Sequence, residues 1–205
     1  MNRKEEIILV TLELAAANGL SNVSMAQIAE KMGIRKPSLY NHFKAKEEII
    51  AAMYQYLREK SKEQLSLADI DYGEFIKGKS MEEALTQSVA NYRNINTENR
   101  MFSFYKVIYS ERSVNPTAAK IMAEETRKMI LATKNLFYAL QVHKKIHVKD
   151  IDMAATSFAM TVHAMMDYQL DCLCSGEPVG QDMIQNYIKW FCNQHGGMND
   201  EKNID

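Results

Sequence analysis

The side chains best suited to chemistry in this sequence are polar groups gathered between residues 35 and 46. Lysine can donate hydrogen bonds to O6 and N7 of guanine, and asparagine can pair with N6 and N7 of adenine; Lys36 and Asn41 supply these two groups. Tyrosine and histidine can bond phosphate oxygens, which fixes a protein on the duplex without reading bases, and Tyr40 and His42 supply them. The spacing therefore predicts a surface that contacts double-stranded DNA.

Presenting such groups to DNA requires two short helices joined by a tight turn. In the run SMAQIAEKMGIRKPSLYNHF, Ser24 and Gln27 have the spacing of a capping box, which predicts a helix over 24–32. Gly33 can take the positive φ that a tight turn demands, and Ala29 is small where the two helices would cross. The run therefore predicts a helix-turn-helix.

The second helix, predicted over 35–42, has an inward and an outward face. Leu39 and Phe43 are four residues apart, so they share a face and are expected in a small core. The N-terminal end of this helix meets base edges in helix-turn-helix proteins. The residues predicted to contact DNA are Ser24, Arg35, Lys36, Pro37, Ser38, Tyr40, Asn41, His42 and Lys46.

Local charge favours the same interpretation. Residues 24–46 contain five basic residues and one acidic residue, a net charge of +4, although the whole chain carries −1. A basic segment on an acidic body can meet phosphate in one orientation. Lys46 lies in the first turn of a helix predicted from residue 45, where the helix dipole disfavours a cation. A DNA phosphate over that helix end would suit both the dipole and the lysine.

Residues 3–50 resemble the N-terminal domain of the TetR family of bacterial transcriptional regulators, and the most specific part of the likeness is the run LYNHFKAK from Leu39 to Lys46. The resemblance implies a homodimer that binds a palindromic operator and usually represses transcription until a small molecule releases it. It implies phosphate contacts for Tyr40, His42 and Lys46, and base contacts for Lys36, Pro37, Ser38 and Asn41.

Two positions depart from the family pattern. Arg35 stands where a serine or threonine commonly caps the recognition helix, so the usual hydroxyl cap is missing, although Arg35 can itself reach a phosphate. Ala26 occupies a position that carries a base-reading side chain in some relatives, so that contact is not expected in this protein.

The rest of the chain is also predicted to be helical, because only three prolines and eight glycines interrupt it. We expect an all-α fold: a three-helix helix-turn-helix DNA-binding domain over 1–46, a larger helical ligand-binding and dimerisation domain over 47–197, and a disordered tail over 198–205. Residues 66–80 read as a loop or a ragged helix end. Further helices are expected over 3–18, 81–95, 98–111, 116–142, 149–174 and 181–194.

Apolar stripes on the last two predicted helices favour a homodimer. Two helices from each subunit can form an intermolecular four-helix bundle, and a dimer suits a palindromic operator. The alternative is that both stripes pack only within the subunit. The residues predicted to form the interface are Phe158, Val162, Met165, Ile184, Tyr187, Ile188 and Phe191.

The middle helices are rich in methionine and aromatic residues, which suits a pocket for a small apolar or amphipathic ligand. The alternative is a solid core, in a TetR-like regulator without a small-molecule ligand. His163 and Asp167 are four residues apart among apolar neighbours and are candidate polar anchors. The residues expected around a ligand are Phe104, Tyr105, Met129, Phe137, His163 and Asp167.

No cofactor, metal site or catalytic centre is predicted. His143 and His147 have the spacing of a helical zinc pair but no evident third ligand. Cys172 and Cys174 are two apart, so they would point in different directions on a helix. No glycine-rich phosphate loop, nucleophile elbow or paired catalytic His–Glu motif occurs, so we do not expect an enzyme. A helical interaction protein that does not bind DNA is the other alternative, and the +4 segment argues against it.

The sequence also predicts where in the cell the protein is found. It has no apolar run long enough for a membrane span, and its first residues, MNRKEEIILV, lack the apolar core of a signal peptide. Its three cysteines suit reduced thiols. We therefore expect a cytoplasmic protein.

Overall fold

The computed structural model describes residues 2–64, 70–97, 99–178, 180 and 182–197, without the side chains of 57–58, 60–64, 94–97 and 99–102. Within these ranges the regular structure is helical, apart from one isolated antiparallel bridge, so the all-α prediction is confirmed. The tail predicted to be disordered, 198–205, lies outside the described residues.

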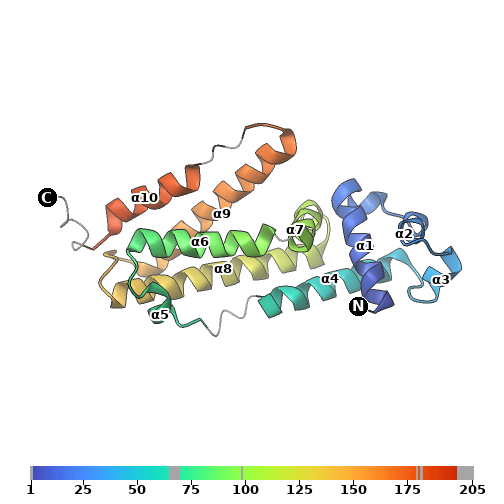
Figure 1. Cartoon of the computed structure of the whole chain (residues 1–205), viewed down its shortest axis with the longest axis horizontal. Coiled ribbons are helices and arrows are strands. Elements are labelled where there is room, and N and C mark those ends of the chain that lie inside the picture. The colour runs from blue at the N-terminus through green and yellow to red at the C-terminus, as the bar shows by residue number, and fades with distance from the viewer. Residues whose placement is uncertain (1, 65–69, 98, 179, 181, 198–205) are drawn as a thin grey trace. The chain divides into compact units, whose positions relative to one another are not determined.

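Apart from the end of α4, for which no bound was predicted, the long helices begin and end within two residues of their predicted bounds, because capping residues and glycines mark many of these ends (Figure 1). Two short elements, η1 and α5, were not predicted, since three and five residues are too few to show a helical period. The elements are α1 (Arg3–Asn18), the 3-10 turn η1 (Leu20–Asn22), α2 (Met25–Lys31), α3 (Lys36–Tyr40), α4 (Lys46–Gln64), α5 (Tyr72–Ile76), α6 (Met81–Thr97), α7 (Asn99–Glu111), α8 (Pro116–Val142), α9 (Ile151–Ser175) and α10 (Met183–His195).

The chain divides into two compact units, and each has its own core. The first comprises residues 1–66 and 94–125, and the second comprises residues 67–93 and 126–205. Helices α6 and α8 contribute residues to both. The boundary predicted after residue 46 stays a prediction, while α4 and α7 belong to the unit that holds the helix-turn-helix.

Helix α1 is central to the first unit, where it packs against α2, α4 and α7. Tyr56 of α4 donates a hydrogen bond from its hydroxyl to Glu5 Oε1 at 2.9 Å, which ties α4 to the start of α1. The core buries apolar residues from α1, α2, α3, α4, α7 and α8, among them Ile7, Leu12, Ile28, Leu39, Ile49, Met53, Phe104 and Ile121.

Helices α5, α6, α8, α9 and α10 share the core of the second unit. Three phenylalanines meet at its centre: the ring centroid of Phe158 lies 5.5 Å from that of Phe137 and 5.1 Å from that of Phe191. Rings at these separations attract one another beyond the effect of burying apolar area. The aromatic cluster therefore joins α8, α9 and α10 within this unit.

The segment that follows α8 pairs with the end of α10. The backbone N–H of His147 donates to the carbonyl of His195 at 2.7 Å, and that of Gly197 donates to the carbonyl of Lys145 at 3.1 Å. These bonds flank the antiparallel bridge between Ile146 and Gly196. The two ends of the α9–α10 hairpin are thus held together. Of the helices that the structure describes, none has the length and apolar character needed to cross a bilayer.

Candidate nucleic-acid interface

Ser24, predicted both as a helix cap and as a DNA contact, uses its hydroxyl in the capping box of α2. Its Oγ accepts the backbone N–H of Gln27 at 3.3 Å and donates to Gln27 Oε1 at 2.7 Å. Gln27 Oε1 also accepts the backbone N–H of Ser24 at 2.9 Å. The capping box is confirmed, and a DNA contact by Ser24 stays a prediction that has to compete with these bonds.

Gly33 makes the tight turn that the helix-turn-helix requires. Its φ is +64°, a left-handed value that costs glycine little. Its N–H bonds the carbonyl of Glu30 at 2.9 Å, and the N–H of Ile34 bonds the carbonyl of Ala29 at 3.0 Å. This is the Schellman arrangement, which satisfies the last carbonyls of α2. The turn therefore sets the direction in which α3 leaves α2.

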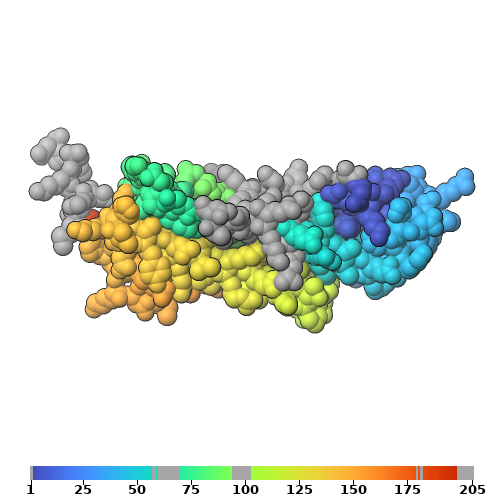
Figure 2. Space-filling model, turned by 90° about the horizontal axis from the view of Figure 1, so that it is seen from below, coloured from blue at the N-terminus to red at the C-terminus, as the bar shows by residue number. Residues whose placement is uncertain are grey.

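Helix α3 turns one face inward and leaves the rest exposed. Leu39 is 0% exposed and Phe43 is buried in the same core, so the predicted inward pair is confirmed. Tyr40, between them in sequence, is 43% exposed. In Figure 2 the light-blue atoms of this segment lie on the surface. The exposed predicted contacts are Arg35, Lys36, Pro37, Ser38, Tyr40 and Asn41, and His42 is half-buried.

The start of α3 lacks a side-chain cap. Arg35 precedes the helix with an extended backbone, φ −76° and ψ 144°, and its side chain makes no capping bond. The Arg35 carbonyl instead accepts the N–H groups of Ser38 at 2.9 Å and Leu39 at 3.4 Å. The exposed guanidinium of Arg35 therefore takes no part in capping α3.

Side-chain bonds fix the turn between α3 and α4. Glu48 Oε2 accepts the backbone N–H of Lys44 at 2.8 Å, and Lys44 Nζ donates to the carbonyl of Tyr40 at 3.2 Å. Lys4 Nζ lies 5.6 Å from the ring centroid of Phe43, within the range of a cation–π contact. These contacts hold the exposed face of α3 in place relative to α1 and α4.

Lys46, the predicted phosphate contact in the first turn of α4, has protein partners. Its Nζ donates to the carbonyl of Leu20 at 3.0 Å and to that of Ser21 at 3.1 Å. A lysine ammonium has three N–H donors, so two are used inside the protein. The two carbonyls of η1 therefore account for a lysine in the first turn of α4, where the helix dipole disfavours a cation. A phosphate contact through the third N–H donor of Lys46 stays a prediction.

The residues predicted to form the dimer interface lie mostly inside the subunit, and their place in an interface stays a prediction. Met165 and Tyr187 are half-buried against the core of the second unit. A side chain already buried in one subunit offers little surface to another, which favours the alternative that the remaining five residues pack only within the subunit. These buried residues are Phe158, Val162, Ile184, Ile188 and Phe191.

A different set of apolar side chains faces outward from the same two helices. Met153 and Met160 are seven residues apart on α9, on the side away from Phe158 and Val162, and Tyr168 is exposed further along the helix. Trp190, on α10, is 55% exposed. The remaining exposed apolar residues of these helices are Leu173 and Met183.

The residues predicted to surround a ligand do not share one environment. Phe104 is fully buried in the core of the first unit, and Phe137 is fully buried in the core of the second. Each therefore packs in a core, and a role in ligand binding stays a prediction for both. His163 Nε2 lies 3.9 Å from Asp167 Oδ2, and both side chains are partly exposed. Roles in ligand binding stay predictions for Tyr105, Met129, His163 and Asp167.

The described residues also bear on metal binding. In those residues, no three His, Cys, Asp or Glu side chains come together in a way that could hold a metal ion. Cys172 is buried, Cys174 is exposed and Cys192 is half-buried, and none of these three described cysteines forms a disulfide bond.

Comparison with known families gives two matches. Residues 7–53 match the tetR family of bacterial regulatory proteins, and residues 83–189 match the C-terminal domain of AefR-like transcriptional repressors. Nucleoid occlusion factor SlmA of Vibrio cholerae serotype O1 is 30% identical over 60 residues, which are 29% of this chain and 31% of that protein. The chain thus spans about a third of the length of this curated relative.

Solved structures show the same fold over nearly the whole chain. A TetR-family regulator from Mesorhizobium loti has a TM-score of 0.63 at 17% identity, covering 96% of this chain and 100% of its own. A transcriptional regulator from Saccharomonospora viridis, solved with choline, has a TM-score of 0.62 at 16% identity, covering 93% of each chain. A third regulator, from Marinobacter aquaeolei, has a TM-score of 0.62 at 19% identity and covers 95% of this chain and 87% of its own.

The family matches and the structure agree. The first match covers the capped α2, the Gly33 turn and the exposed α3, and the second covers most of the helices that follow. The chain therefore belongs to the TetR family of bacterial transcriptional regulators, which bind DNA.

Proposed function

We propose that this protein is a homodimeric repressor that binds a palindromic operator through α3 and is released from it by a small molecule. One observation carries the DNA-binding part: α3 buries Leu39 and leaves Lys36, Ser38 and Asn41 exposed. These are the side chains that can read base edges in the major groove. Tyr40 and His42 flank them as phosphate contacts.

Dimerisation is assigned to the outward face of α9 and α10. A palindromic operator presents two half-sites about 34–36 Å apart, which a two-fold symmetric dimer can occupy together. Met153, Met160, Tyr168 and Trp190 give this face exposed apolar area, and such area on a soluble protein is typical of an interface. A four-helix bundle made from two subunits would cover it.

Two similarities to known proteins support repression and release by a small molecule. The C-terminal family match is described as a transcriptional repressor. The fold neighbour from Saccharomonospora viridis was solved with choline, so this fold accommodates a small ligand. Release requires that the ligand prefer a conformation in which the recognition helices do not fit successive major grooves.

The direct test is a fluorescence-anisotropy titration of the purified protein with labelled DNA from upstream of its own gene. A repressor should bind this DNA with strong salt dependence and in preference to scrambled DNA of the same length. Transcription from that promoter in vitro should fall as the protein is added. Binding without preference for the upstream DNA would contradict the proposal, and increased transcription would replace repression by activation.

A further inference from the structure

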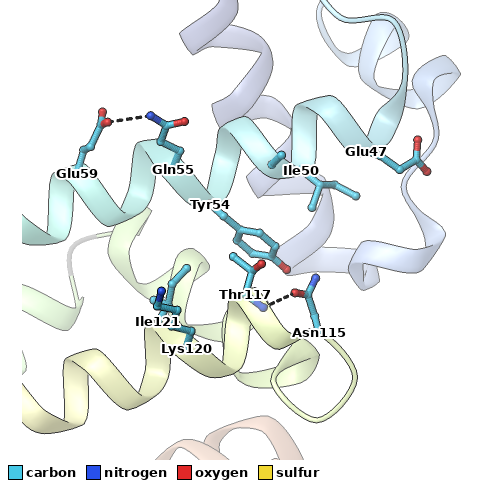
Figure 3. A pocket seen from close by; sticks show the side chains of 10 residues that line it. Glu47, Ile50, Tyr54, Gln55, Glu59, Asn115, Thr117, Lys120 and Ile121 are labelled. Carbon is cyan, nitrogen blue, oxygen red and sulfur yellow. Dashed lines mark hydrogen bonds between the residues drawn. The ribbon is translucent and has the colours of Figure 1, made fainter.

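An open groove of about 740 Å³ runs along α4 and the first turns of α8, and every residue that lines it belongs to the first unit (Figure 3). Small-molecule sites have volumes of roughly 300–1,000 Å³. Ile50, Ala51 and Ile121 give the groove apolar walls. This site is separate from the residues predicted to surround a ligand, none of which lines it.

The hydroxyl of Tyr54, a residue that lines this groove, is a buried polar group without a hydrogen-bond partner among the described residues. The residue is 3% exposed. Figure 3 shows the phenol reaching from α4 toward Asn115 and Thr117 at the start of α8. Asn115 Oδ1 is occupied, because it accepts the backbone N–H of Thr117 at 2.9 Å and that of Ala118 at 3.3 Å. Buried polar groups nearly always have a partner, so Tyr54 points to a molecule that supplies one.

The charges around Tyr54 are mainly negative. Glu47 and Glu59 line the α4 side of the groove, and Lys120 lines the α8 side. Burial, and secondarily the nearby carboxylate of Glu111, raise the pKa of Tyr54 to about 12. The hydroxyl is therefore neutral at pH 7, and the negative potential of these carboxylates favours a cationic donor near the phenol oxygen.

We propose that this groove binds an amphipathic organic amine, whose ammonium group donates to the Tyr54 hydroxyl oxygen and whose apolar part packs against Ile50 and Ile121. The exposed carboxylates of Glu47 and Glu59 attract the cation toward the groove. Lys120 opposes it, so the charge of this lysine limits affinity.

Occupancy of the groove is linked to the helix-turn-helix through α4. Ile49 and Met53, on the same helix as Tyr54, are fully buried in the core that also contains Leu39 of α3. A ligand that changes the position of α4 would therefore change the operator affinity, and DNA would change ligand affinity by the same factor. This consequence rests on the proposed function, whereas binding of the amine does not.

The test is isothermal titration of the full-length protein, without DNA, with three probes on one skeleton: 4-phenylbutylamine, 4-phenylbutan-1-ol and 4-phenylbutyrate. We expect the amine to bind most tightly and the carboxylate most weakly. Tyr54→Phe keeps the ring and removes the acceptor, so it should weaken amine binding by about five- to tenfold. Glu47→Gln should weaken it and Lys120→Gln should strengthen it, each by about two- to threefold.

The second unit offers a matched control. The hydroxyl of Tyr72 is also buried without a partner, and Tyr72 does not line the groove. Tyr72→Phe should leave amine affinity unchanged. The proposal is overturned if the amine does not bind at millimolar concentration, if the carboxylate binds more tightly than the amine, or if Tyr54→Phe and Tyr72→Phe bind the amine equally. Thermal unfolding of Tyr54→Phe at or above the wild-type temperature shows that a lost affinity is local.

Discussion

The ammonium nitrogen of Lys46 lies 3.0 Å from the carbonyl oxygen of Leu20. This bond and the one to Ser21 connect the first turn of α4 to the turn that precedes α2. Lys46 therefore has a structural role in the helix-turn-helix, whether or not its third donor also reaches a phosphate. Its replacement has to be interpreted with both roles in mind.

Lys46→Ala should lower both stability and DNA affinity. Loss of its two bonds, one partly buried and one exposed, should reduce the free energy of unfolding by about 1–2 kcal/mol, measured by urea denaturation. Loss of a phosphate contact should reduce the salt dependence of operator binding by about one contact per subunit, or two per dimer. An unchanged salt slope with reduced stability would assign Lys46 a structural role alone. Lys31→Ala, which removes an exposed pair with Glu13 at 3.6 Å, serves as the control for stability.

Substitutions on the exposed face of α3 should change base preference. Asn41→Ala should cost about 1–3 kcal/mol at the base it reads and relax specificity there, and Lys36→Ala should do the same at another position. Selection of binding sites from a randomised operator library measures both effects. Gln87→Ala, on the exposed side of α6, should leave the selected sequence unchanged. A uniform loss of affinity without any change in the selected bases would contradict the assignment.

Two aspartate substitutions should distinguish an effect on dimerisation from an effect on folding of the subunit. Ile188 is 1% exposed inside the subunit, so Ile188→Asp should unfold it, since an unpaired buried charge costs several kcal/mol. Met160 is 44% exposed on α9, so Met160→Asp should leave the subunit folded and weaken the dimer. Light scattering and circular dichroism report the two properties. A folded Met160→Asp protein that remains fully dimeric at micromolar concentration would remove Met160 from the interface.

Alkaline pH should destabilise the first unit through Tyr54. A tyrosine is neutral while protonated, and burial followed by the Glu111 carboxylate raises the pKa of Tyr54 from 10.0 to about 12. The folded state therefore holds this proton more tightly, so the free energy of unfolding is unaffected below pH 10 and falls from about pH 10 to about pH 12. Tyr54→Phe should show a smaller loss in urea titrations at pH 9, 10 and 11. Equal losses in the two proteins would show that Tyr54 does not couple to folding.

Sequence signals with a local physical cause predicted the fold well. The Ser24–Gln27 capping box and Gly33 act through bonds between neighbouring residues, and the structure contains them. Pro116 after Asn115 likewise marks the start of α8. Such features need no knowledge of the rest of the chain, and for this reason helix ends could be predicted within two residues.

Choosing between two apolar faces of one helix could not be done from spacing. Helix α9 carries one stripe through Phe158 and Val162 and another through Met153 and Met160, and both have helical periodicity. The structure buries the first and exposes the second. Which face turns inward depends on α8 and α10, whose rings pack on Phe158. The same reason explains Phe104 and Phe137, because residue type alone does not separate a core aromatic from one that lines a cavity.

The pairing of residues 145–147 with residues 195–197 has a practical consequence for protein engineering. Because the N–H of Gly197 is bonded to the Lys145 carbonyl, the polypeptide is anchored up to this glycine. A purification tag or fusion partner should therefore be attached beyond Gly197. A truncation that ends before His195 would remove its carbonyl and release one end of the α9–α10 hairpin, which adds conformational entropy that the full chain does not have.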